Sequence, residues 1–193
     1  MSETHTPVSR VEPKPDFVDE IRSSVDARLA RFFADRRSEI LRAAPDAMLL
    51  LDGLEELTMR GGKRLRPAVL VAAQRAVRPQ GSLSDVISAC AGLEILQSYL
   101  LIHDDWMDGD LERRGGPSVH VLLAKRVGNQ HLGNALGILS GDLGSAYAWD
   151  LTMESAALAP SPGAALDVFS RMQRDVVLGQ ALDLTGSTDV TRE

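Results

Sequence analysis

The sequence contains one stretch that sets the expected fold, Leu96-Gln97-Ser98-Tyr99-Leu100-Leu101-Ile102-His103-Asp104-Asp105-Trp106-Met107-Asp108. Most of it is apolar enough for a buried helix, but its end carries three aspartates, and carboxylates are almost never fully buried without a cation or a metal. On a helix, Asp104 and Asp108 share one face, with Asp105 beside them. Because like charges at this spacing repel, the stretch predicts a buried helix that ends in an ionic site.

The aspartates allow two interpretations. Magnesium typically binds one or two carboxylates together with water and the phosphate oxygens of a substrate, so the spacing fits a platform for metal and diphosphate. The same residues could instead mark an acidic helix end in solvent, because runs of charge are usually exposed. The neighbouring basic segments favour the first interpretation.

Composition limits the class of protein. With 193 residues, 44% hydrophobic and 25% charged, the chain is long enough for one globular domain, which we place at residues 16–193 after a flexible tail at 1–15. A net charge of −6 argues against nucleic-acid binding. A lone Cys90 and the lack of a signal peptide or a long apolar span predict a cytoplasmic protein without a transmembrane segment. His103 and His120 have no metal-ligand spacing with the cysteine and are expected to pack as polar residues.

Apolar residues recur at helical spacing through most of the chain, and no long strand-like alternation is present, so the predicted fold class is all-α. Asp16 and Ser82 are expected to cap the helices that follow them. The expected helices cover residues 16–44, 46–59, 67–78, 82–108, 131–158 and 163–184, with a short helix after Ser118.

A basic run, Lys63-Arg64-Leu65-Arg66, follows the glycine pair Gly61-Gly62 at the start of a helix. Backbone N–H groups also point outward at a helix start, so these cations suit phosphate or diphosphate. The alternative is a glycine C-cap followed by solvated basic residues.

Further polar residues accompany the aspartates. Arg113 and Arg114 come just after them and could form surface ion pairs or hold a diphosphate. Gln97 lies two turns before the aspartates and could be a core amide or a donor to a phosphate oxygen. Gln180 and Asp183 add an amide and a carboxylate to an apolar helix, which is a weak signal alone.

Taken together, these motifs resemble the trans-isoprenyl diphosphate synthases, the farnesyl and geranylgeranyl diphosphate synthase family, from about residue 20 onward. The resemblance implies an isoprenoid-synthase-type helical bundle around a central cavity. It also implies an enzyme that uses Mg²⁺ to join isopentenyl diphosphate to an allylic diphosphate and that forms a homodimer. The segments that carry it are Gly61 to Pro67, Gln97 to Asp108, Arg113 to His120, Gly141-Asp142 and Gly179 to Asp183.

The resemblance also implies roles for single residues. Asp104 and Asp108, supported by Asp105, would hold magnesium on the allylic diphosphate, which Arg113 would also contact. Tyr99 and Leu100 match positions related to product length, and their pattern favours a C20 product. The remaining substrate-binding residues would be Lys63, Arg66 and Arg114 for isopentenyl diphosphate, together with Gln97, Gln180 and Asp183.

One departure concerns the downstream motifs of the family. A Lys-Thr pair and a second aspartate-rich motif do not occur in the 193 residues. We therefore expect the chain to be the N-terminal portion of a single all-α prenyl synthase domain. It would lack the C-terminal helices of that domain and be inactive by itself. Alternative functions are a noncatalytic helical subunit that modulates a complete synthase, a farnesyl diphosphate synthase, and a terpene cyclase, although a cyclase does not explain the basic run.

Overall fold

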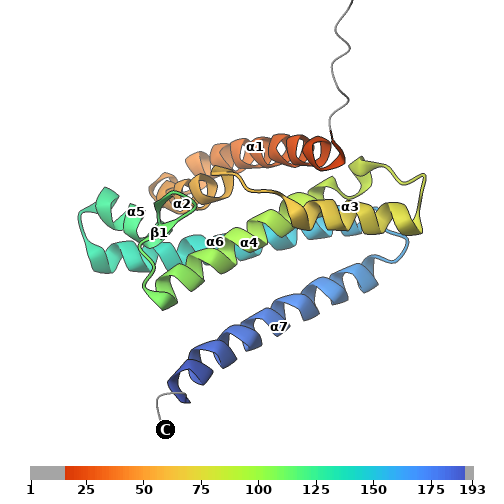
Figure 1. The fold of residues 1–193 in the computed structure, drawn as a ribbon. Helices are drawn as coiled ribbons and strands as arrows, with labels where there is room; N and C mark the ends of the chain where they lie inside the picture. Colours follow the sequence, from red (N-terminus) through yellow and green to blue (C-terminus); the bar gives the residue numbers. More distant parts are fainter. Residues whose placement is uncertain (1–15, 190–193) are drawn as a thin grey trace, which may run out of the picture.

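Two long helices, α4 (Ile87–Asp108) and α6 (Gln130–Ala156), pack antiparallel at the centre of the molecule (Figure 1). Helices α1 and α2 lie on one side of this pair and α7 lies on the other, and α3 packs beside the first part of α4 (Figure 1). The computed structural model describes residues 16–189, so the predicted tail at 1–15 lies outside the described residues. The other elements are α1 (Phe17–Ala43), η1 (Pro45–Ala47), α2 (Met48–Met59), α3 (Leu65–Val77), η2 (Leu83–Asp85), β1 (Glu112–Arg113), β2 (Gly116–Pro117), α5 (Val119–Val127) and α7 (Pro162–Asp189).

The all-α prediction is confirmed, and so are the positions of the main helices. Two details differ. Ser82 does not cap the long central helix; it caps the short 3₁₀ turn η2 in a capping box with Asp85, and the non-helical backbone of Val86 (φ −124°, ψ −1°) separates this turn from α4. A small hairpin, in which Arg113 pairs with Gly116, follows α4, where the all-α prediction included no strand.

The core forms where apolar faces of four helices meet. Leu29 and Phe33 of α1, Leu54 of α2, Ile95 of α4 and Leu151 of α6 are all fully buried in one cluster. Burial of each such side chain contributes about 1.5–3 kcal/mol, so this cluster holds α4 in a fixed position.

Glycines let α6 approach its neighbours closely. A Cβ on Gly133 would overlap the backbone of Ala124 in α5, and a Cβ on Gly141 would overlap the imidazole of His103 in α4. Close packing of this kind fixes the end of α4 that carries the aspartates. None of the helices in the described part of the chain is long and apolar enough to cross a membrane.

Candidate functional site

The three aspartates occupy the last turn of α4, but they face two different environments. Asp104 is partly exposed and Asp108 is exposed, whereas Asp105 is fully buried. The guanidinium of Arg113 donates from Nε to Asp105 Oδ1 at 2.6 Å, and its Nη2 lies 3.6 Å from Asp104. Arg113 therefore joins the hairpin to the end of α4.

Burial has the largest effect on the Asp105 carboxyl of this ion pair. Desolvation raises the pKa of the Asp105 carboxyl above its ordinary value, and the hydrogen bond and charge of Arg113 oppose this rise. The same hydrogen bond raises the pKa of Arg113, which therefore stays charged.

The donor set fits a metal through two of the aspartates. Asp104, partly exposed, and Asp108, exposed, place two carboxylates one turn apart, which suits Mg²⁺ when substrate and water complete its shell. Among the described residues, no group of three or more His, Cys, Asp or Glu could hold a metal by themselves. Asp105 faces Arg113 instead, and its other oxygen is buried without a hydrogen-bond partner among the described residues. A metal-binding role for Asp105 stays a prediction without geometric support.

A cleft of about 560 Å³ opens beside Asp104, between α4 and α7. Gln180 of α7 donates from Nε2 to Asp104 Oδ1 at 3.0 Å, so residues 76 positions apart meet here. The structure thus brings together six of the predicted residues, which all line this cleft: Arg66, Gln97, Tyr99, Leu100, Asp104 and Gln180.

The basic run divides into exposed and buried cations. Lys63 and Arg66 are exposed, but the side chain of Arg64 is only 1% exposed. Arg64 donates to Glu94 at 2.6 Å and to Asp26 at 2.9 Å, and its backbone is left-handed (φ 47°). Arg64 thus anchors the loop, while Arg66 reaches the cleft.

Arg114 lies against the same loop. Its Nη1 donates to the carbonyl of Gly61 at 3.1 Å. Burial lowers the pKa of Arg114, and the charges of Arg64, Arg66 and Arg113 lower it further, whereas Glu94 raises it. Arg114 and Arg66, which lines the cleft, therefore repel each other, and an anion between them would relieve the repulsion.

Six of the predicted residues do not line the cleft: Lys63, Asp105, Asp108, Arg113, Arg114 and Asp183. Lys63 and Asp183 are exposed, and their roles stay predictions. His103, which was expected only to pack, does line it. Its Nε2 lies 3.0 Å from the carbonyl of Ile138 and 3.6 Å from Asp142, and its position directly before Asp104 was the one available signal.

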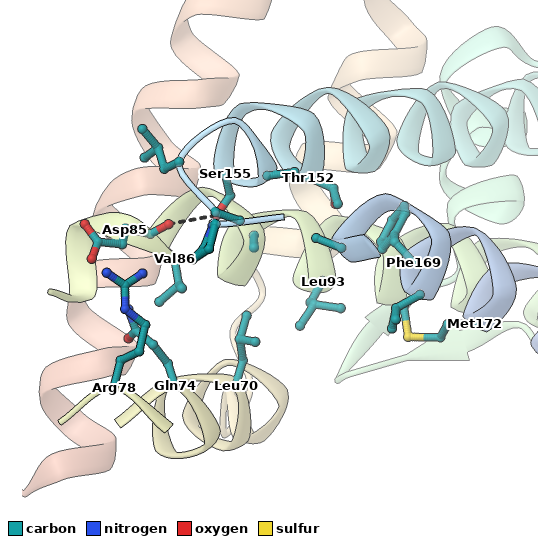
Figure 2. Close-up of a pocket in the computed structure, with 17 residues that line it drawn as sticks. Leu70, Gln74, Arg78, Asp85, Val86, Leu93, Thr152, Ser155, Phe169 and Met172 are labelled. Atoms are coloured by element: carbon teal, nitrogen blue, oxygen red, sulfur yellow. Dashed lines mark hydrogen bonds between the residues drawn. The ribbon is translucent and has the colours of Figure 1, made fainter. Parts of the chain in front are cut away.

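A second, mainly apolar cavity of about 510 Å³ lies farther back along α4 and α7 (Figure 2). Leu93, Phe169 and Met172 form its apolar wall, and Arg78 and Asp85 stand on one side of it. The first half of α4 and the first half of α7 line this cavity, whereas their later residues line the cleft.

These features define an all-α protein with acidic and basic side chains at one cleft and apolar space along the same helices. The family model described as polyprenyl synthetase matches residues 48–193, and the chain belongs to this family. The resemblance found in the sequence is confirmed.

Individual relatives agree with this assignment. The chain is 35% identical over 174 residues to geranylgeranyl diphosphate synthase of Methanosarcina mazei, covering 89% of this chain and 48% of that protein. It is 35% identical over 133 residues to farnesyl diphosphate synthase of Geobacillus stearothermophilus, covering 65% and 41%. The crystal structure of geranylgeranyl pyrophosphate synthase from Corynebacterium glutamicum, complexed with isoprenyl diphosphate and magnesium, aligns with a TM-score of 0.70 and 31% identity, covering 86% of this chain and 49% of that one. The chain spans about half the length of these relatives.

Proposed function

We propose that this chain supplies the first half of the active site of a short-chain prenyl diphosphate synthase, which condenses isopentenyl diphosphate with an allylic diphosphate. The observation that carries the proposal is the cleft in which Asp104, hydrogen-bonded to Gln180, lies with Arg66. Relatives are named as synthases of geranylgeranyl, geranylfarnesyl and farnesyl diphosphate, which supports this substrate class.

The residues suggest how the reaction is assisted. Magnesium held by Asp104 and Asp108 would neutralise charge on the allylic diphosphate as its C–O bond breaks. Arg113, beside Asp104, would stabilise the leaving diphosphate, and Arg66, Arg114 and Lys63 would hold isopentenyl diphosphate. The double bond of isopentenyl diphosphate then attacks the allylic cation, and a proton is lost to the released diphosphate. The apolar walls of the cleft would keep water from the cation.

We propose a C20 product. Tyr99 and Leu100 line the cleft near Asp104. Leu93, which lines the apolar cavity, lies eleven residues before Asp104 on α4, about 16 Å along the helix axis. A prenyl chain that extends from Asp104 back along α4 would point toward this cavity. A farnesyl diphosphate synthase is the alternative, in which Tyr99 would close the cleft.

We also propose that the chain forms a homodimer through α6. Leu132, Leu139 and Met153 recur at intervals of seven or fourteen residues and are 45%, 49% and 47% exposed. Sedimentation velocity tests this directly, because a monomer at micromolar concentration would contradict it.

Calorimetric titration of the chain with farnesyl diphosphate, in magnesium or in EDTA, tests the proposed site. We expect Asp104→Asn and Asp108→Asn each to weaken magnesium-dependent binding about tenfold or more, equal to at least about 1.4 kcal/mol. Asp105→Asn is the matched control; it should lower the melting temperature but keep the magnesium dependence, because its carboxylate faces Arg113. If the folded chain binds no prenyl diphosphate in magnesium, the noncatalytic subunit becomes the better interpretation.

A further inference from the structure

The hairpin that carries Arg113 and Arg114 is held from outside by a side chain of α2. Arg60, the C-cap of α2, donates from Nη1 to the carbonyl of Arg113 at 2.6 Å and from Nη2 to the carbonyl of Pro117 at 2.8 Å. These two carbonyls belong to the two strands of the hairpin, β1 and β2. One guanidinium therefore bridges both strands.

Arg60 is itself fixed in place. Its Nε and Nη2 donate to the two carboxylate oxygens of Glu56, one turn earlier in α2, at 3.1 and 2.6 Å. The side chain of Arg60 is only 11% exposed. A guanidinium has five N–H donors, and four of them are used here in a planar, bidentate arrangement, so the group has little freedom to move.

The contact is reciprocal. Arg60 of α2 donates to carbonyls of the hairpin, and Arg114 of the hairpin donates to the carbonyl of Gly61, directly after Arg60. Arg114 and Gly115 form the two-residue loop, with φ values of 54° and 75°, as a type I′ hairpin requires. A positive φ is unfavourable for arginine, so surrounding contacts must hold Arg114 in this conformation.

The hairpin also leaves space for Arg60. A Cβ on Gly116 would lie 2.7 Å from Arg60 Cζ, so any side chain at this position would displace the guanidinium. Gly116 is not one of the described glycines whose φ is positive. The space taken by Arg60 therefore accounts for a glycine at this position better than backbone freedom does.

We propose that Arg60 is a positioning residue that clamps the hairpin to the end of α2 and thereby sets where Arg113 and Arg114 stand beside the cleft. This inference rests on the proposed function, because it assigns the two hairpin arginines to diphosphate. Arg60 acts through them and does not itself line the cleft.

Limited digestion with trypsin tests the clamp without any ligand. Trypsin cleaves after arginine, and cleavage at Arg113 or Arg114 requires the hairpin to open locally. We expect Arg60→Met and Gly116→Ala each to raise the rate of cleavage at these two sites about tenfold. Arg171→Met is the matched control, because Arg171 forms an exposed i,i+4 ion pair with Asp167 on α7. Unchanged cleavage in both variants overturns the clamp.

Binding separates positioning from a merely structural role. We expect Arg60→Met to weaken binding of isopentenyl diphosphate about tenfold, as loss of a supporting residue typically does. In an Arg114→Met background, Arg60→Met should reduce the affinity for isopentenyl diphosphate much less. Its effect on the melting temperature should be the same in both backgrounds. If Arg60→Met reduces the affinity equally in both backgrounds, the positioning role is overturned.

The two proposals fail in different ways. If neither the parent chain nor Arg114→Met binds diphosphate, the proposed function fails, and digestion alone decides whether Arg60 clamps the hairpin. If the parent binds and Arg114→Met does not, but Arg60→Met binds like the parent, the positioning role fails and the proposed function stands.

Discussion

Arg64 and Arg66 stand two residues apart, but the structure gives them different tasks. Arg64 is buried in ion pairs with Glu94 and Asp26, and Arg66 is exposed at the cleft. Removing one partner of a buried ion pair leaves an uncompensated charge, which costs about 3–5 kcal/mol. Arg64 thus contributes mainly to the fold of the loop, and substitutions at the two positions will have different consequences.

The buried imidazole of His120 makes stability depend on pH. Burial lowers the pKa of His120 below its ordinary value of 6.5, and the charge of Asp105 opposes this effect. Because the folded pKa is depressed, the unfolded chain takes up the proton first as the pH falls below 6.5, and stability is lost over this range. Between pH 7.5 and 5, the free energy of unfolding should therefore fall more in the parent chain than in His120→Gln.

Urea unfolding of both proteins at three pH values measures this difference. Asp105, whose burial raises its pKa, changes stability in the opposite sense but is present in both proteins. Parallel curves of unfolding free energy against pH would show that His120 does not titrate differently on folding.

Residue-level roles could be predicted from the sequence only where a motif was available. Asp104, Gln97 and Arg66 were found in this way, and the structure places all three at the cleft. The pairing of Asp105 with Arg113 and the clamp by Arg60 depend on contacts between distant segments, which spacing along one helix does not reveal.

At the level of elements, periodicity was sufficient for the long helices. It failed for η2 and for the hairpin, because a three-residue turn and two-residue strands are too short to show a period. Periodicity did not explain the glycines of α6 either, because their function is the close approach of another helix.

Close packing between α5 and α6 predicts a strong effect at Gly133. A Cβ there would overlap the backbone of Ala124, which cannot rotate away as a side chain could. We expect Gly133→Ala to destabilise the fold by about 1–3 kcal/mol, as overpacking does. Gly179→Ala is the control; its Cβ would meet no described atom within 4 Å, so it should stabilise α7 by about 0.5–1 kcal/mol. Chemical denaturation measures both, and equal effects would contradict the packing argument.

The molecule as a whole places two cavities along the same two helices. The cleft beside Asp104 has polar groups from α4, from α7 and from Arg66 of α3, and the cavity at Leu93 is mainly apolar. A diphosphate with a hydrocarbon tail combines the same two properties. This arrangement depends on how α4 and α7 lie relative to each other, which no single segment of the sequence specifies.

If the apolar cavity receives the far end of a long prenyl chain, filling it should affect long ligands only. Leu93→Trp places a larger side chain in the cavity, away from Asp104. We expect the affinity for geranylgeranyl diphosphate to fall about tenfold or more, because each CH₂ kept from burial costs about 0.8 kcal/mol. Geranyl diphosphate, whose tail is half as long, should bind as it does to the parent chain.

Leu178→Trp, at an exposed position of α7, is the matched control. Calorimetry with both ligands decides the point: equal weakening of both would mean that the substitution disturbs the diphosphate site, and no weakening of either would mean that the tail lies elsewhere.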